Sequence, residues 1–163
     1  MERLWAPWRM TYISGIPNGS DCFLCDIHSG GDDAANLVVE RREHVFVVLN
    51  RFPYNNGHTL VCPAAHKAAL AELSDDEMLA LMQATRDTVA LLERVMHAQG
   101  FNIGVNLGHV SGAGLPGHVH MHIVPRWSGD TNFMPVLGDV KVIPQALEDL
   151  REKLVAALKE DRA

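Results

Sequence analysis

The chain has 163 residues, of which 47% are hydrophobic and 21% are charged, and its formal net charge is −6. This composition is typical of a globular protein with a hydrophobic core and not of a disordered chain. The acidic balance disfavours a broad nucleic-acid interface, which needs a basic surface, and no run of about 18 apolar residues predicts a membrane span. We therefore expect one domain over residues 1–163, with neither nucleic acid nor membrane as a partner.

The first 20 residues combine an aromatic, apolar segment with a loop that contains glycine and proline. We interpret residues 1–20 as a strap that packs onto the domain or onto a partner subunit. The segment lacks the apolar core of a secretory signal, and three cysteines, an odd number, argue against a disulfide framework. Both observations predict a cytoplasmic protein whose cysteines are thiols or metal ligands.

Five short runs rich in β-branched and other apolar residues predict strands. The first two runs are joined by a charged turn, and the third stops at Pro63. In chain order, the predicted strands cover residues 37–40, 45–49, 59–62, 101–106 and 119–124. Five strands of this length are enough to build one sheet.

Two main helices are predicted in addition to the strands. Ser74 followed three residues later by Glu77 is typical of a capping box, and apolar residues then recur at helical spacing toward a stop at Gly100. Pro144 opens the second helix, over residues 144–160. Because strands and helices are clustered rather than alternating, the sequence predicts an α+β fold with a five-stranded, mostly antiparallel sheet.

Three histidines, His118, His120 and His122, alternate with apolar residues in the last predicted strand. Side chains on a strand switch faces at every residue, so the three imidazoles should face one way, about 6.6 Å apart. The preceding segment, residues 108–117, contains four glycines, whose backbone N–H groups can approach a ligand closely. Together these features predict a pocket for an elongated polar ligand or for a metal ion.

Two kinds of chemistry fit this histidine pattern. A histidine with its ordinary pKa near 6.5 is largely neutral at pH 7 and can attack phosphorus, which gives a phosphoramidate that a second nucleophile breaks. Alternatively, the three imidazoles could bind one zinc ion, as in zinc hydrolases. The spacing alone leaves both open.

Cys22 and Cys25 have the spacing of zinc ligands, but they supply only half of a four-ligand site. His28 is close to them in the sequence, and His66 is a second candidate for a further ligand. Cys62 lies inside an apolar strand, so we expect it to be buried and inert. His58, taken alone, is typical of a turn histidine at the mouth of a strand.

The run of residues 118–124 resembles the signature of the histidine triad family, in which three histidines alternate with apolar residues. Residues 49–53 and 57–63 resemble the branch of that family that hydrolyses dinucleoside polyphosphates. Residues 5–10 and 125–145 look closer still to its bacterial diadenosine tetraphosphate phosphorylase branch. The similarity extends over nearly the whole chain.

This resemblance implies a homodimer in which the two five-stranded sheets join into one continuous sheet. It also implies nucleotidyl transfer through a covalent nucleotidyl-histidine, which would cleave dinucleoside polyphosphates such as diadenosine tetraphosphate. Attack by inorganic phosphate or by water in the second step would make the enzyme a phosphorylase, which we slightly favour, or a hydrolase. Alternatives within the family are a nucleoside phosphoramidate hydrolase and a nucleotide-binding signalling module with incidental turnover. No organic cofactor is implied.

The resemblance also assigns roles to individual residues. His120 matches the nucleophile, and His58 and His122 match residues that contact phosphate oxygens. Asn50 matches a residue that contacts ribose and Asn106 a polar residue on the phosphate side. The remaining residues that we assign to the nucleotide site are Leu49, Gly112 and Gly114.

In zinc-bearing members, two cysteines near the N-terminus join one histidine after the third strand and the first histidine of the triad. The matching residues here are Cys22, Cys25, His66 and His118, so the resemblance favours His66 over His28 and implies a structural zinc ion. The chain departs from many members where they carry Gln-Ser before the triad, because it has Gly114 and Leu115 there.

Overall fold

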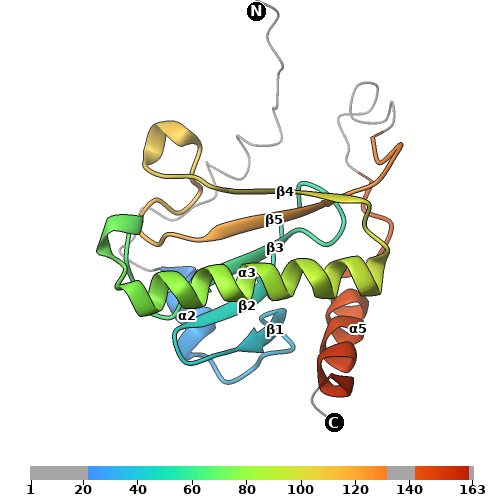
Figure 1. Ribbon diagram of the computed structural model, residues 1–163, viewed down its shortest axis with the longest axis horizontal. Coiled ribbons are helices and arrows are strands. Elements are labelled where there is room, and N and C mark those ends of the chain that lie inside the picture. The colour runs from blue at the N-terminus through green and yellow to red at the C-terminus, as the bar shows by residue number, and fades with distance from the viewer. Residues whose placement is uncertain (1–21, 132–141, 162–163) are drawn as a thin grey trace, which may run out of the picture.

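A computed structural model of the chain describes residues 22–131 and 142–161 (Figure 1). The predicted strap over residues 1–20 lies outside the described residues. The elements, in chain order, are α2 (Phe23–Ser29), β1 (Val38–Arg41), β2 (Val45–Leu49), β3 (Thr59–Pro63), η1 (Leu70–Glu72), α3 (Asp75–Met96), β4 (Gly100–Val105), η2 (His109–Ser111), β5 (Met121–Arg126) and α5 (Leu147–Glu160).

The five strands form one sheet in the order β1-β2-β3-β5-β4, and every neighbouring pair is antiparallel. This confirms the predicted α+β fold. The pairing that places the histidines is that of β3 with β5, in which Thr59 lies opposite Ile123 and Leu60 opposite His122. Residue 58, one position before β3, is thereby brought next to the middle of β5.

The last strand begins later than the sequence predicts. We expected a strand over residues 119–124, but β5 covers Met121–Arg126, so His118 and His120 precede it. The physical reason is a competing hydrogen bond: the N–H of Val119 donates to the carbonyl of Lys67 at 2.7 Å, outside the ladder between β3 and β5. Only His122 of the three histidines therefore lies within a strand.

Helix α3 begins as the capping box predicts. The Ser74 hydroxyl accepts a hydrogen bond from the N–H of Glu77 at 3.2 Å, and the Glu77 carboxylate accepts one from the N–H of Ser74 at 2.7 Å. The helix ends at Met96 rather than near Gly100, because His97 adopts the left-handed conformation with φ 51° and Gly100 already begins β4. The second predicted helix begins at Leu147, three residues after Pro144.

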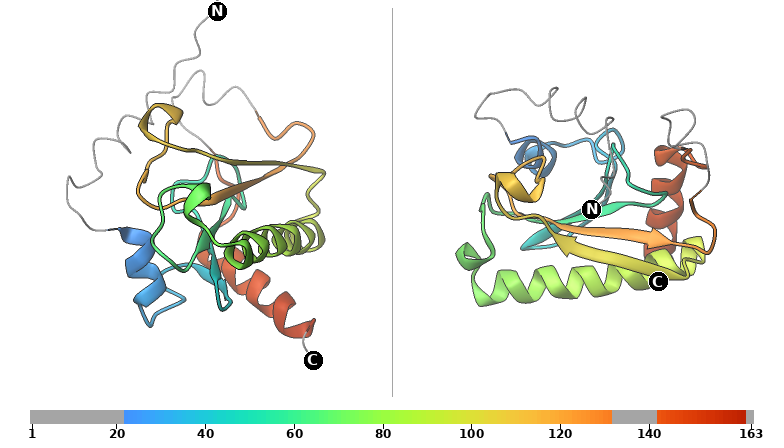
Figure 2. Two further views of the ribbon diagram at one scale, coloured as in Figure 1. Left: turned by 60° about the vertical axis from the view of Figure 1, so that its left-hand side comes forward. Right: turned by 90° about the horizontal axis from the view of Figure 1, so that it is seen from above.

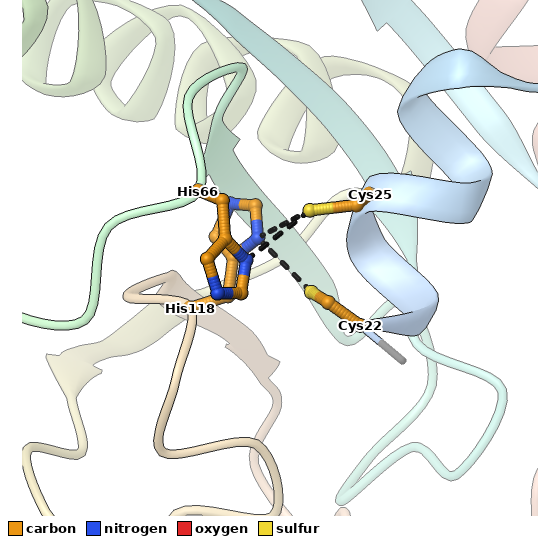
Figure 3. Close-up of side chains that lie close together, drawn as sticks. All are labelled: Cys22, Cys25, His66 and His118. Atoms are coloured by element: carbon orange, nitrogen blue, oxygen red, sulfur yellow. Dashed lines mark hydrogen bonds between the residues drawn. The ribbon is translucent and has the colours of Figure 1, made fainter. Parts of the chain in front are cut away.

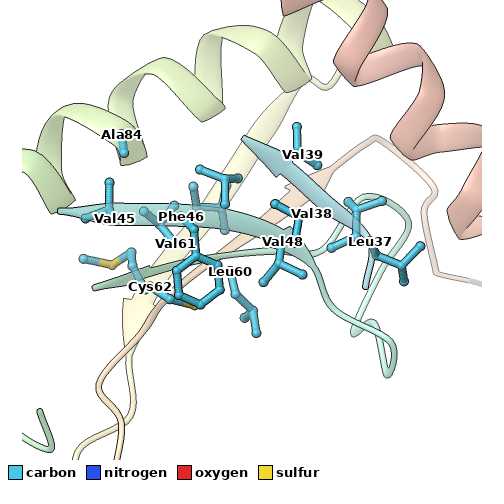
Figure 4. Packing of buried hydrophobic residues seen from close by; sticks show 14 of the residues in the cluster. Leu37, Val38, Val39, Val45, Phe46, Val48, Leu60, Val61, Cys62 and Ala84 are labelled. Carbon is cyan, nitrogen blue, oxygen red and sulfur yellow. The ribbon is translucent and has the colours of Figure 1, made fainter. Parts of the chain in front are cut away.

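Helices cover the sheet unequally. In Figure 2, α3 lies along one side of the sheet, whereas α2 and the segment with η2 lie on the other. Part of the hydrophobic core lies between α3 and the sheet, where Ala84 of α3 faces Val45, whereas Phe46 and its cross-strand partner Cys62 lie on the opposite face of the sheet, where the Phe46 ring stacks on His28 of α2 (Figure 4). Cys62 is fully buried, as predicted. No helix among residues 22–131 and 142–161 is both long and apolar enough to cross a membrane.

Candidate active site and metal centre

The three histidines that the sequence singles out belong to two neighbouring groups of side chains. The Nδ1 atom of His118 points to Cys22 and Cys25, at 3.2 and 3.6 Å from their sulfur atoms. The rings of His120 and His122 instead lie together, with their centroids 4.8 Å apart. In this arrangement a single metal ion bound by all three histidines is not favoured, because His118 is already directed toward the cysteines.

Four potential metal ligands meet at the first group, drawn in Figure 3. Cys22 and Cys25 come from the start of α2, His66 from the loop after β3, and His118 from the segment before β5. The Cys25 sulfur lies 3.2 Å from Nδ1 of His66, and the four ligand atoms all lie within 4.8 Å of one another. Bonds of about 2.0 to 2.3 Å to tetrahedral zinc would place such ligand atoms roughly 3.3 to 3.8 Å apart, so the set fits zinc after small side-chain shifts.

The chemistry of the four side chains also fits a cation. The Nε2–H of His118 donates to the carbonyl of Pro63 at 2.9 Å, which leaves the lone pair of the neutral ring on Nδ1, directed at the two sulfurs. Burial lowers the pKa of His118 and keeps the ring neutral. Burial and the adjacent Cys22 raise the pKa of Cys25 to about 11, an effect that a bound divalent cation reverses.

His28, the alternative third ligand, lies elsewhere. Its Nδ1 atom is 3.5 Å from the guanidinium of Arg41, and its ring stacks on Phe46 with the centroids 5.2 Å apart. Of the two candidates, the structure therefore brings His66 and not His28 to the cysteines.

His58 joins His120 and His122 in the second group. The loop that contains Tyr54 also contributes to it, although the sequence analysis did not assign that residue to the site. The backbone N–H of Tyr54 donates to Nδ1 of His58 at 3.0 Å, and the Asn50 amide nitrogen lies 3.3 Å from the same atom. Since Nδ1 accepts, the proton of the neutral ring is on Nε2, which donates to Nδ1 of His122 at 3.0 Å. His122 is consequently protonated on Nε2.

Tyr54 also stacks its ring on His58, with a centroid separation of 4.6 Å, and lies 6.0 Å from the ring of His122. A single aromatic residue in a loop gives no periodic signal, so the sequence offered no way to find it. Asn50, expected as a ribose contact, is oriented by the N–H of Phe52, which donates to its side-chain oxygen at 2.9 Å.

His120 has the opposite arrangement of its ring protons. Its Nδ1 lies 2.7 Å from the carbonyl oxygen of His118, and because a carbonyl can only accept, Nδ1 carries the proton and Nε2 carries the lone pair. Burial lowers the pKa of His120 and outweighs the opposite effect of this hydrogen bond. A neutral imidazole with an unprotonated Nε2 thus stands beside a second imidazole with an N–H, which is a pairing of a nucleophile with a hydrogen-bond donor.

Asn106, Gly112 and Leu49, which the sequence analysis also assigns to the nucleotide site, differ in their position in the fold and in their exposure. Asn106 follows Val105, which pairs with Met121, so it lies close to His120 along the sheet. Gly112 ends η2 with φ 83°, a conformation that favours glycine. Leu49 as a whole is only 1% exposed and belongs to the core, so it offers almost no surface to a ligand.

A family model, curated relatives and a solved structure all relate this chain to the same group of proteins. The family model described as the HIT domain matches residues 32–129. An AP-4-A phosphorylase from Mycobacterium tuberculosis is 40% identical over 94% of this chain and 83% of its own length. An asymmetrical bis(5'-nucleosyl)-tetraphosphatase from Schizosaccharomyces pombe is 35% identical over 75% of this chain and 58% of its own length. The crystal structure of a Zn-bound histidine triad family protein from Mycobacterium smegmatis, 26% identical, superposes with a TM-score of 0.71 over 87% of this chain and 96% of that chain.

Proposed function

The chain belongs to the HIT family, and from this we propose that it is an enzyme that cleaves dinucleoside polyphosphates, such as diadenosine tetraphosphate, by nucleotidyl transfer through His120. The observation that carries the proposal is the tautomer of His120, whose Nδ1–H is taken by the His118 carbonyl at 2.7 Å so that Nε2 is left to attack. The names of two relatives, a phosphorylase and a tetraphosphatase, support the substrate class.

In the first step, the Nε2 lone pair of His120 attacks the α-phosphorus of the substrate. The bond from that phosphorus to the bridging oxygen breaks, and its electron pair leaves with the rest of the polyphosphate chain as a nucleotide. The Nε2–H of His122 would donate to a phosphate oxygen and stabilise the developing negative charge. The product of this step is a nucleotidyl group bonded to His120.

In the second step, water or inorganic phosphate attacks the same phosphorus, the N–P bond breaks, and its electron pair returns to Nε2 of His120; where water attacks, the proton that it loses passes to the solvent. Throughout, the N–H of Tyr54 holds the proton of His58 on Nε2, and His58 in turn holds the proton of His122 on its outer nitrogen. These two hydrogen bonds, from Tyr54 to His58 and from His58 to His122, keep the Nε2–H of His122 available as a donor in both steps.

The second nucleophile decides between two enzyme classes, and we propose phosphorolysis. The relative named as a phosphorylase is 40% identical to the chain over 94% of its length, more than the relative named as a tetraphosphatase at 35% over 75%. Water remains the competing acceptor.

Product analysis with diadenosine tetraphosphate tests this proposal. We expect ATP and ADP to form when inorganic phosphate is present and little turnover without it, because phosphate is the second nucleophile. ATP and AMP in phosphate-free buffer, at the rate seen with phosphate, would instead assign a hydrolase. Failure to cleave the substrate under either condition would contradict the proposed substrate.

We further propose that Cys22, Cys25, His66 and His118 hold a structural zinc ion, which would cross-link α2 to the loops before β5 and after β3. A closed site with four protein ligands leaves no position for substrate, so the ion would take no part in the chemistry. The homodimer remains a prediction; β4 lies at one edge of the sheet and its Ile103 is 48% exposed, which leaves an apolar surface for a second copy.

A further inference from the structure

We propose that the metal centre positions the nucleophile, through the single peptide unit that joins His118 to Val119. This inference rests on the proposed function, because it takes His120 as the attacking residue, and on the proposed zinc centre. It makes His66 and His118 positioning residues for the reaction, in addition to their roles as ligands.

Both polar groups of that peptide unit are engaged. Its carbonyl oxygen, from His118, accepts the Nδ1–H of His120 at 2.7 Å. Its N–H, from Val119, donates to the carbonyl of Lys67 at 2.7 Å. The orientation of one peptide plane therefore decides whether the carbonyl faces Nδ1 of His120, and the hydrogen bond from Val119 fixes that orientation.

The peptide unit also lies between two segments that carry metal ligands. His118, which supplies its carbonyl, directs Nδ1 to Cys22 and Cys25, and Lys67, which receives its N–H, directly follows His66. The Lys67 segment is anchored a second time, because the Lys67 ammonium lies 2.6 Å from the carboxylate of Glu77 in the capping box of α3. Metal ligation would thus tie the segments on either side of the peptide unit to α2 and hold them at a fixed separation.

Loss of the metal would release this constraint. The segments carrying His66 and His118 would then be joined only by hydrogen bonds such as that from Val119 to Lys67, so the His118 carbonyl would be held less firmly against Nδ1 of His120. A histidine without that acceptor can place its proton on Nε2 instead, and this tautomer has no lone pair on the attacking nitrogen. The metal would accordingly favour the reactive tautomer without touching the substrate.

The test compares three variants. His66→Ala removes a ligand whose side chain is exposed, so the hydrophobic core is untouched. His66→Cys restores a four-ligand set, because three cysteines and one histidine also bind zinc. His28→Ala is the matched control, since His28 is the neighbouring histidine outside the cluster.

Two readouts are measured besides zinc content. The first is the tautomer of His120 in substrate-free protein, measured from the nitrogen chemical shifts of its ring. This readout is independent of which residue attacks the substrate. The second is the separate effect on kcat and KM. We expect His66→Ala to lose zinc, to show a mixture of His120 tautomers, and to lower kcat about tenfold or more with KM within about twofold. His66→Cys and His28→Ala should behave like the wild type.

A folded, zinc-free His66→Ala protein with the wild-type His120 tautomer and kcat would overturn the inference while leaving the proposed function intact. If His66→Ala does not fold, zinc is titrated out of the wild-type protein with a chelator while the His120 signals are followed. The tautomer should then change in proportion to the metal removed, in protein that remains folded. Unfolding in step with metal loss would overturn the inference, because the metal would then act on the whole fold.

Discussion

Replacing His120 with asparagine is expected to lower kcat/KM for diadenosine tetraphosphate by at least about 10³-fold, because the variant has no nucleophile. The asparagine amide can still donate to the His118 carbonyl, which His120 now contacts at 2.7 Å, so the local hydrogen bond is kept. It offers no nitrogen lone pair to phosphorus. Steady-state kinetics under the conditions of the product analysis measure the effect.

The control for this variant is His97→Asn. His97 is an exposed histidine with φ 51°, a conformation that asparagine tolerates well, so the control makes the same chemical change away from the site. We expect it to retain full activity. Turnover at the wild-type rate in folded His120→Asn protein would remove His120 from the reaction.

The Cys22→Ser, Cys25→Ser double variant is expected to lose its zinc and about 3 kcal/mol or more of unfolding free energy, because metal binding to a structural site contributes directly to folding. Cys22 is buried and Cys25 half-buried, both beside the His118 ring, so the loss also loosens the packing of α2. Metal analysis and denaturant unfolding measure the two effects.

Cys62→Ala is the control for the thiols, since Cys62 is fully buried but lies outside the four-ligand set. It should keep about one zinc per chain, the stoichiometry of a four-ligand structural site. If the double variant binds zinc as fully as the wild type, Cys22 and Cys25 are not its ligands.

The parts of the fold that the sequence predicts well depend on local patterns. Strand β2 covers Val45–Leu49 as predicted, because a continuous run of apolar residues there is bounded by a charged turn and a loop. The start of α3 follows from Ser74 and Glu77, which satisfy each other within one helical turn. Helix α2 was missed, because its single buried residue, Leu24, gives no helical periodicity.

The parts that the sequence predicts less well depend on contacts between distant residues. The late start of β5 results from the hydrogen bond of Val119 to Lys67, which no local pattern encodes. The alternation of His118, His120 and His122 predicts three imidazoles that face one way, but it does not predict their division into two groups. That division arises because Cys22, 96 residues away in the chain, lies against the ring of His118.

The protonation pattern of the site likewise could not be predicted from residue types. It follows from three backbone groups, the N–H of Tyr54 and the carbonyls of His118 and Pro63. An N–H can only donate and a carbonyl can only accept, so each group determines which nitrogen of its histidine partner carries the proton. Backbone groups of this kind are placed by the fold, and their sequence neighbours do not reveal them. They explain how chemically identical imidazoles acquire different roles within one site.

The most direct measurement is to mix the protein with diadenosine tetraphosphate labelled in its α-phosphates, to quench the reaction within one turnover under alkaline conditions, and to locate the label by mass spectrometry of peptides. The account predicts an acid-labile nucleotidyl group on the peptide that contains His120, formed in the wild type and absent in His120→Asn. Turnover without any adduct on that peptide, at quench times that span the first turnover, would contradict it.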